Sequence, residues 1–454
     1  MTASLGFAAT AMGGRLHGVD AEYTRVSIDT RALQAGDLFV ALKGPNFDGA
    51  DYLDAAREQG AAAAVVTERR DTALAQIVVD DTYAALGKLG SSWRDSQDLT
   101  VVGLTGSNGK TTLKELIGGI LTRVGKTLAT EGNLNNHIGV PLTLCRIRPQ
   151  HRFAVIEMGA NHAGEIAYLT SLVRPDAVAL TNAGPAHLEG FGSIKGVSRA
   201  KGEILSGTPR PRTAVLNADD QYFDYWCGLA SDIDVLSFGL GAAADVTARR
   251  VELHGDGSAF ELVLPDATTD VRLALTGEHN VRNACAAAAV AHSLGAAAGD
   301  IAAGLAAVQP VGGRLAAVEG RNGLRVFDDS YNANPSSVVA AAGFLAALDG
   351  PRCFVLGDMG ELGEEAASIH VQCGCDIRAA GVETLYALGD LTRHSVRGFG
   401  SGAVWFETLE ELVAALGRDL EAGTAVLVKG SRFMAMERVV AALTGEDRRR
   451  GEAH

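Results

Sequence analysis

The stretch VVGLTGSNGKTTLKELIGGI, residues 101–120, decides how the surrounding chain folds. An apolar run typical of a β-strand leads into a glycine turn, and a helix-like pattern follows the turn. Gly109, Lys110 and Thr111 stand in the order that phosphate-binding loops use, although Leu104 occupies the place of the usual first glycine. Because backbone N–H groups at a helix start can hold phosphates, this stretch predicts a nucleotide-binding loop.

Two side chains of the loop have the chemistry for separate roles. We expect Lys110 to reach the terminal phosphates and the Thr111 hydroxyl to bind Mg²⁺. Glu157 ends the next apolar run, where it is either an acidic metal partner or an ordinary strand-end carboxylate. The predicted phosphate contacts are Thr105, Gly106, Ser107, Asn108, Gly109, Lys110, Thr111 and Thr112.

Short apolar runs that end in polar residues or glycine recur along the chain, as in LTVVGLTG, RFAVIEMG, PDAVALTN and RTAVLNAD. Near-continuous apolar strands favour a parallel sheet covered on both faces, with ligands beyond the carboxyl ends of the strands. The pattern restarts near residue 313. We therefore predict an α/β protein with three domains: a small α/β domain (1–82), a central P-loop mononucleotide-binding domain with a parallel sheet (83–312) and a C-terminal Rossmann-like domain (313–454).

Composition narrows the class of protein. The 454 residues carry a net charge of -14, whereas a generic nucleic-acid binder is expected to be basic. We expect no membrane span, because no strongly apolar stretch reaches about 18 residues, and the start lacks the basic region of a secretory signal. The six scattered cysteines favour free thiols in a reducing cytoplasm over a zinc site.

Several polar residues remain undecided on residue type alone. GNLNNHIGVPLT groups Asn135 and Asn136 in a loop that offers amide groups to a polar ligand. GEHNVRNACAAA places two asparagines near a helix start, where capping and nucleotide contact are both open. His187 follows the strand pattern PDAVALTN, and Lys201 lies in RAKGEI; an ordinary hydrogen-bonded histidine and a solvated lysine are the simpler interpretations of these two residues.

Taken together, the motifs resemble those of the Mur ligase family of cytoplasmic peptidoglycan synthesis. The resemblance covers nearly the whole chain and rests on TGSNGKTT, EGNLNNHIGVPLT, VIEMGANHAGEI, NAGPAHLEGFGS, AKGEI, GEHNVRNA, DDSYNANP, VLGDMGELG and KGSRFMAMERVV, with DTRALQAGDLFVALKGPNFDGADYL near the start. The family's own loop has the short glycine form, which agrees with Leu104.

The resemblance implies an ATP-dependent ligase. The forms DDSYNANP and VLGDMGELG, and the absence of Asp-Asn-Pro-Arg, point to the member that joins D-alanyl-D-alanine to a UDP-N-acetylmuramoyl-tripeptide. In such ligases ATP phosphorylates the terminal carboxylate of the substrate, the incoming amine attacks the acyl phosphate, and phosphate leaves. A reactive acyl phosphate must be shielded from water, which favours closure of the domains.

The resemblance also assigns roles to residues. It makes Lys110, Glu157, His187 and Lys201 catalytic, with Glu157 and His187 holding a second Mg²⁺ and Lys201 carbamylated by CO₂; Lys195 is the alternative lysine. It implies that the nucleotide contacts include Asn280, Asn283, Arg314, Asp329 and Asn332. Substrate contacts are expected at Thr30, Arg31 and Asn46 for the UDP-sugar in the N-terminal domain, at Asn135 and Asn136, and at Asp358, Lys429, Ser431 and Arg432 near the dipeptide.

Two other hypotheses about the function stay open. Another Mur ligase, or a relative that makes folylpolyglutamate or cyanophycin, would keep the chemistry and change the substrate. A switch GTPase or motor ATPase would use the same loop for regulation, but the guanine motif Asn-Lys-x-Asp does not occur. We expect a cytoplasmic monomer that binds no nucleic acid, and the third residue of the tripeptide is either lysine or diaminopimelate.

Overall fold

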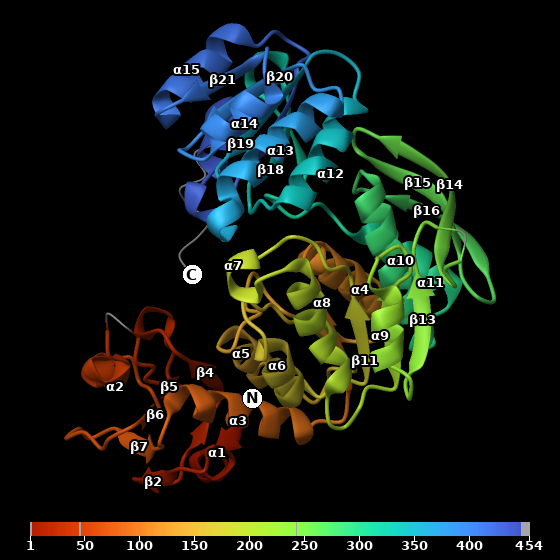
Figure 1. The fold of residues 1–454 in the computed structure, drawn as a ribbon. Helices are drawn as coiled ribbons and strands as arrows, with labels where there is room; N and C mark the ends of the chain where they lie inside the picture. The colour runs from red at the N-terminus through yellow and green to blue at the C-terminus, as the bar shows by residue number, and fades with distance from the viewer. Residues whose placement is uncertain (1, 45–46, 242, 446–454) are drawn as a thin grey trace.

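The protein is described by a computed structural model that covers residues 2–44, 47–241 and 243–445. Three α/β bodies follow one another along the chain (Figure 1). The N-terminal body lies at the lower left of the view, the central body at the lower right, and the C-terminal body above the central one. The predicted α/β class is confirmed.

The N-terminal body is built on a small, mostly parallel sheet. Only its edge strand β2 runs antiparallel to its neighbour; the remaining pairs are parallel. The sheet order is β2 (Arg15–His17), β7 (Ala75–Val78), β6 (Ala63–Val66), β5 (Asp37–Val40) and β4 (Arg25–Ser27). Around it lie α1 (Leu5–Met12), α2 (Leu53–Glu58) and the short pair β1 (Ala3–Ser4) and β3 (Glu22–Tyr23).

The central body contains the predicted parallel sheet. Its order is β13 (Asp234–Phe238), β12 (Thr213–Asn217), β11 (Ala177–Leu180), β8 (Thr100–Thr105), β10 (Phe153–Glu157) and β9 (Thr127–Ala129), and every pair is parallel. Successive side chains of a strand point to opposite faces. Val101 accordingly belongs to one core and Val102 to the other, so both faces of the sheet are buried.

Helices supply the cover on each face. One core joins the sheet to α5 (Gly139–Cys145), α6 (Glu165–Val173), α8 (Ile194–Gly202) and α9 (Phe223–Leu229). The other joins it to α4 (Lys110–Val124), α10 (Glu278–Ser293) and α11 (Ala298–Ala307). The Ala-rich segment of α10 is fully buried, as close packing between small side chains requires.

A second sheet interrupts the strand-and-helix repeat of the central body. The strands β14 (Thr247–His254), β15 (Gly257–Val263) and β16 (Thr268–Leu273) form an antiparallel sheet at the right of Figure 1. The apolar runs described above do not predict this sheet. The sequence does contain a signal for it: the turn His254-Gly255-Asp256-Gly257, between the segments that form β14 and β15, is typical of a hairpin.

The C-terminal body is Rossmann-like, with one exception at the edge of its sheet. The order is β17 (Ala316–Glu319), β18 (Arg325–Asp329), β22 (Ala425–Lys429), β19 (Arg352–Gly357), β20 (Thr384–Leu388) and β21 (Ala403–Phe406). Only β17 is antiparallel to its neighbour. The helices are α12 (Pro335–Ala346), α13 (Ala366–Ala379), α14 (Thr392–Phe399), α15 (Leu409–Asp419) and α16 (Glu437–Thr444).

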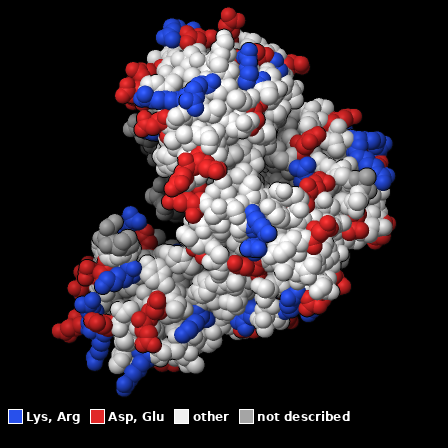
Figure 2. Space-filling view, in the orientation of Figure 1, with Lys and Arg blue, Asp and Glu red and all other residues white. Residues whose placement is uncertain are grey.

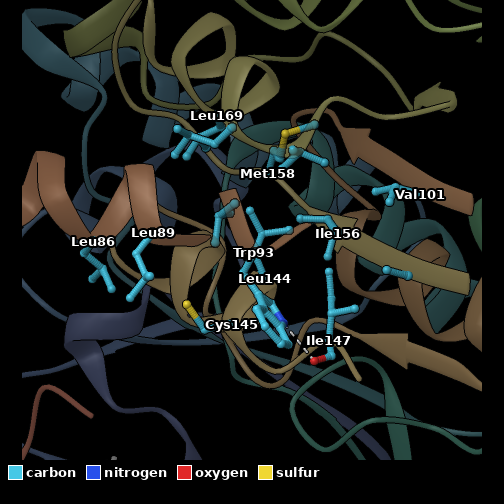
Figure 3. Close-up of a cluster of buried hydrophobic side chains, with 14 of the residues drawn as sticks. Leu86, Leu89, Trp93, Val101, Leu144, Cys145, Ile147, Ile156, Met158 and Leu169 are labelled. Carbon is cyan, nitrogen blue, oxygen red and sulfur yellow. Dashed lines mark hydrogen bonds between the residues drawn. The ribbon is translucent and has the colours of Figure 1, made fainter. Parts of the chain in front are cut away.

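Helix α3 (Thr82–Asp95) joins the first two bodies through a shared core. Leu86, Leu89 and Trp93 pack beside Leu144 of α5, and Figure 3 shows these side chains meeting. The indole Nε1 of Trp93 donates a hydrogen bond to the carbonyl oxygen of Ile147 at 3.0 Å. The N-terminal body is therefore fixed to the central one by apolar burial as well as by the chain connection.

No helix in the described part of the chain is long and apolar enough to cross a membrane. The six cysteines are free thiols.

Candidate active site

The loop that we predict to bind phosphate lies between β8 and α4. Leu104 is fully buried inside β8, so the turn begins only at Gly106, and the missing first glycine belongs to the strand. Gly106 has φ 151° and Gly109 has φ 79°, both in the region that favours glycine. Gly109 also caps the start of α4.

The end of the neighbouring strand β11 holds the loop in place. Thr181 Oγ1 donates to the carbonyl oxygen of Asn108 at 2.6 Å, and the Asn108 N–H donates to Asn182 Oδ1 at 3.0 Å. Ser107 Oγ donates to the carbonyl oxygen of Gly184 at 3.2 Å. The loop conformation is thus set by a strand that lies about 75 residues further along the chain.

Replacement of Gly106 by alanine is expected to distort the loop. A Cβ there would lie 1.8 Å from Thr181 Oγ1, and φ 151° costs a residue other than glycine about 1–3 kcal/mol. We expect weaker nucleotide binding and a lower free energy of unfolding, measured by nucleotide titration and urea denaturation. Gly118→Ala in α4, where a Cβ meets only Ala129 at 3.8 Å, is the matched control and should bind nucleotide normally.

Lys110 is folded back onto the loop. Its Nζ donates to the carbonyl oxygens of Gly106 at 2.7 Å and Ser107 at 3.2 Å. Burial lowers the pKa of Lys110, Glu157 opposes that shift, and Arg314 adds to it. Neighbouring groups therefore offset the positive charge of the ammonium group only in part, and an anionic ligand would stabilise it.

Glu157 ends β10 beside the loop and is 1% exposed. Its Oε1 accepts hydrogen bonds from Asn135 Nδ2 at 2.7 Å and from Thr111 Oγ1 at 3.5 Å. Its Oε2 is buried and has no hydrogen-bond partner among the described residues. A buried carboxylate oxygen without a donor fits a cation, so the residues present fit Mg²⁺.

Protein ligands alone do not complete a metal site in the described part of the chain. No group of three or more His, Cys, Asp or Glu side chains is arranged to hold a metal ion there. Mg²⁺ is usually bound by one or two carboxylates together with substrate phosphates and water. Glu157 and Thr111 match that kind of site.

His187 follows β11 and begins α7 (Leu188–Phe191) in a left-handed conformation, with φ 52°. Its Nδ1 is hydrogen-bonded to a carboxylate oxygen of Glu361, which comes from the C-terminal body. Burial lowers the pKa of His187; Glu361 raises it, while Lys110 and Lys201 lower it further. The histidine is therefore placed among the charged groups of the site rather than on a free surface.

Lys201 is buried in α8 and is 1% exposed. Its Nζ donates to the carbonyl oxygen of Ala160 at 3.3 Å and lies 5.3 Å from the centre of the Phe191 ring. Burial, with a smaller contribution from Lys110, lowers its pKa to about 7, while Glu165 and Glu203 oppose the shift. Lys195 is exposed, so burial favours Lys201 as the lysine of the site.

The residues predicted to contact nucleotide come from both sides of the interface between the central and C-terminal bodies. Asn283 lies next to Gly109, since a Cβ on that glycine would be 2.7 Å from Asn283 Oδ1. Asn280 is buried and donates to the carbonyl oxygen of Thr276 at 2.8 Å. Arg314 donates to Thr111 Oγ1 at 3.1 Å, so the structure brings it to the loop.

Asp329 ends β18, Asn332 follows it, and the two residues share one partner. Lys429 Nζ contacts Asp329 Oδ2 at 2.6 Å and the carbonyl oxygen of Asn332 at 3.0 Å. The sequence assigns Lys429 to the dipeptide and Asp329 to the nucleotide. In the structure the buried Lys429 and the half-buried Asp329 also form an ion pair, because β18 and β22 are adjacent.

The predicted substrate residues are dispersed, and some have structural partners. Asn136 Oδ1 accepts from the N–H groups of Ile138 and Gly139, so it fixes the turn that leads into α5. Asp358 Oδ1 accepts from the Thr392 N–H at 2.9 Å. Thr30 and Arg31 form a short 3-10 turn in the N-terminal body, where Arg31 pairs with Asp29.

Three further positions were predicted to contact substrate. Ser431 Oγ accepts from the Gly360 N–H at 2.9 Å. Arg432 is exposed and pairs with Glu437 at 3.1 Å. Asn46 lies outside the described residues.

The partners of Asn108 and Arg314 across the two larger bodies were not predicted from the sequence. Asn108 Nδ2 donates to Ser336 Oγ at 2.9 Å, and Asn334 Nδ2 donates to Asn108 Oδ1 at 2.6 Å. Arg314 stacks on Tyr331 at 4.0 Å. Asn334, Ser336 and Tyr331 all lie in or beside the DDSYNANP stretch, so that motif was the available signal, but no pattern shows which residue faces the loop.

Fold and site together define the class of protein: a nucleotide-dependent enzyme whose phosphate loop is in contact with a second, Rossmann-like domain. Three family models match the chain: the catalytic domain of the Mur ligase family over residues 22–91, the Mur ligase middle domain over 104–291, and the glutamate ligase domain of Mur ligases over 313–432. The chain belongs to the Mur ligase family.

Relatives with similar sequence and structure agree with this membership. UDP-N-acetylmuramoyl-tripeptide–D-alanyl-D-alanine ligase of Escherichia coli strain K12 is 44% identical over 435 residues, covering 95% of this chain and 96% of its own. A crystal structure of MurF from Acinetobacter baumannii has a TM-score of 0.93 at 36% identity, with coverage of 98% and 99%. MurF ligase from Thermotoga maritima in complex with ADP has a TM-score of 0.81 at 27% identity, with coverage of 92% and 96%.

Proposed function

We propose that the chain is an ATP-dependent ligase that joins D-alanyl-D-alanine to a UDP-N-acetylmuramoyl-tripeptide, in the synthesis of a cell-wall precursor. The observation that carries the proposal is the contact of the phosphate loop with the C-terminal domain, through Asn108 and Arg314. That contact brings a phosphate donor to a second domain that can present an acceptor. The relative from Escherichia coli, 44% identical over nearly the full length of both chains, supports this choice of substrates.

The reaction is a transfer in two stages. A carboxylate oxygen of the tripeptide attacks the γ-phosphorus of ATP, and ADP leaves, so that an acyl phosphate forms. The amine nitrogen of D-alanyl-D-alanine then attacks the acyl carbon, loses a proton and expels inorganic phosphate. Lys110 and the loop N–H groups stabilise the charge of the transferred phosphoryl group.

The metal ligands proposed from this chain are Thr111, Glu157, His187 and Lys201 in its carbamylated form. When bound, Mg²⁺ supplies positive charge that offsets the phosphate oxygens. The unpaired Oε2 of Glu157 supports its role as a ligand. Carbamylation needs the neutral amine of lysine, and a pKa of about 7 makes that form available near neutral pH. The reaction of the amine with CO₂ releases one proton and leaves an anionic carbamate.

We propose that the nucleotide is held by the loop from Thr105 to Thr112 together with Asn280, Asn283, Arg314, Asp329 and Asn332. The burial of both asparagines of α10 beside the loop supports their assignment. We propose substrate contacts at Thr30, Arg31, Asn46, Asn135, Asn136, Asp358, Lys429, Ser431 and Arg432, and domain boundaries near residues 82 and 312. We also propose that the enzyme acts in the cytoplasm as a monomer.

A phosphate-release assay tests the proposed function. We expect phosphate release from ATP and Mg²⁺ only when the UDP-tripeptide and D-alanyl-D-alanine are both present, with the ligated product detected by mass spectrometry. Tripeptides ending in lysine and in diaminopimelate are compared in parallel. Rapid hydrolysis of ATP without either substrate would instead favour a switch or motor protein.

A further inference from the structure

A short loop after β19, residues Asp358–Glu361, is fixed to the C-terminal domain by three backbone hydrogen bonds. The Ser431 N–H donates to the carbonyl oxygen of Asp358 at 3.0 Å. The Met359 N–H donates to Nε2 of the buried His370 at 3.1 Å, and the Gly360 N–H donates to Ser431 Oγ. Because these residues are anchored in α13 and after β22, the loop must move with its own domain.

The tip of this loop reaches the central domain. The Glu361 carboxylate accepts the hydrogen bond from His187 Nδ1, and the Glu361 carbonyl oxygen accepts from the Glu189 N–H at 3.3 Å. Glu361 and His187 have φ 60° and 52°, which residues other than glycine rarely adopt. Backbone of this kind persists when its surroundings hold it, and here each residue is held by contacts to the opposite domain. Helix α7, which follows His187, lies beside the C-terminal body in Figure 1, and acidic side chains gather at this place in Figure 2.

The closed arrangement of the two domains that brings Glu361 to His187 also brings the phosphate loop into contact with the C-terminal domain. Asn108 is bonded to Ser336 and Asn334, and Thr111 is bonded to Arg314. Separation of the two domains would break these bonds together with the His187–Glu361 bond. The orientation of His187 is therefore tied to the approach of the C-terminal domain.

We propose that Glu361 is a positioning residue that orients His187 for metal binding only when the C-terminal domain is closed against the central one. A carboxylate only accepts hydrogen bonds, so Nδ1 of His187 carries the proton and Nε2 keeps its lone pair. A histidine that binds a metal usually donates its other N–H to a carboxylate in this way. In this chain the carboxylate comes from another domain, which couples closure to the metal site. The inference rests on the proposed function, in which His187 is a metal ligand.

The test compares Glu361→Ala and Glu361→Gln with the control Glu364→Ala. Glu364 is an exposed carboxylate three residues further along the chain, beyond the tip that contacts His187. Mn²⁺ binding to the ADP complex, measured by electron paramagnetic resonance without turnover, is expected to be roughly 10–100-fold weaker in Glu361→Ala and unchanged in Glu364→Ala. Glu361→Gln keeps an oxygen that can accept from Nδ1–H, so its loss should be smaller. Alanine and glutamate are both disfavoured at φ 60°, so the substitution adds no backbone strain, and the thermal midpoint should fall only by what the lost hydrogen bond to His187 contributes.

A double-mutant cycle separates positioning from a general structural effect. Once His187 is replaced by alanine, the additional Glu361→Ala change is expected to weaken Mn²⁺ binding no further, because the group that Glu361 orients is absent. Small-angle X-ray scattering of the ADP and Mn²⁺ complex is expected to show a larger radius of gyration for Glu361→Ala than for Glu364→Ala. In the ligase assay, Glu361→Ala should lower kcat more than it raises KM for ATP.

Two results would overturn the proposal: equal Mn²⁺ affinity in Glu361→Ala and Glu364→Ala, or additive losses in the double variant. Failure of the proposed function looks different. In that case the wild-type protein and Glu364→Ala would also show no phosphate release that depends on the dipeptide, whereas Mn²⁺ binding could still be compared among the variants.

Discussion

Replacement of Lys110 by alanine is expected to abolish phosphate release that depends on D-alanyl-D-alanine. The ammonium group lies at the start of α4, and its hydrogen bonds to the described residues go to loop carbonyl oxygens, which leaves it able to turn to a phosphate. Loss of one preorganised charged donor costs roughly 10²–10³-fold in rate, and we expect at least that loss in kcat. A coupled phosphate assay with both substrates present measures it.

The same variant should remain folded. Lys110 is half-buried, and burial lowers its pKa, so removal of the side chain relieves a desolvated charge while two loop carbonyl oxygens lose a donor. These effects oppose each other, and the urea midpoint should change little. Lys126→Ala, at an exposed lysine beyond the other end of α4, is the control for activity. Normal turnover in folded Lys110→Ala would show that the loop is not the phosphate site.

Replacement of Lys201 by alanine is expected to abolish activity. A small carboxylic acid added to the assay should restore part of it. Alanine leaves a buried space where the carbamate of the wild-type chain would lie, and acetate or propionate can place a carboxylate there. We expect a loss of at least 10²-fold in kcat, comparable to the loss of other preorganised charges, and partial recovery at millimolar carboxylate. Activity is titrated against each acid, and intact-protein mass spectrometry at high bicarbonate tests wild-type protein for the added CO₂.

The carbamate of Lys201 should form more readily as pH rises. Burial lowers the pKa of this lysine from its usual value of 10.5 to about 7, so the reactive neutral amine is scarce at pH 6 and abundant at pH 8. At equal concentrations of dissolved CO₂, protein depleted of CO₂ should therefore recover activity faster at pH 8 than at pH 6. An exposed lysine would remain almost fully protonated over this range.

Lys195→Ala is the matched control for Lys201→Ala. Lys195 lies on the same helix α8 but is exposed, so its loss should leave activity unchanged. The assignment to Lys201 fails if carboxylates restore Lys195→Ala and leave Lys201→Ala inactive. That pair of results would move the carbamylated lysine to the earlier position.

The regular parts of the fold were accessible from sequence because their signals are local. Apolar runs ending in glycine or polar residues marked β8, β10, β11 and β12. The antiparallel sheet β14–β16 was missed, because charged residues interrupt the apolar alternation of its exposed strand β14. The antiparallel edge strand β17 was not foreseen either, since strand direction depends on pairing with β18 and not on the composition of either strand.

Residue type alone does not decide roles that depend on contacts in space. For these residues the structure was needed. The asparagines of GNLNNHIGVPLT look equivalent in sequence, yet Asn135 bonds to Glu157 while Asn136 fixes the turn before α5. Lys429 and Asp329 were assigned to different ligands, and they form one ion pair because their strands are adjacent. Glu361 is one of several acidic residues in this part of the sequence. It differs from the others in its contact with His187, which forms because the two domains approach each other.

The sequence by itself determined the parallel-sheet architecture, the phosphate loop and the similarity to Mur ligases. Glycine turns, apolar runs and motif spacing are local features that consecutive residues define. The tertiary structure decided which carboxylate oxygen lacks a donor, which lysine is buried and which side chains meet across the domain interface. Burial of Lys201 and the pairing of His187 with Glu361 arise from residues far apart in the chain. Electrostatic environments of this kind depend on distance in space, so the pKa of Lys201 and the orientation of His187 were set only by folding.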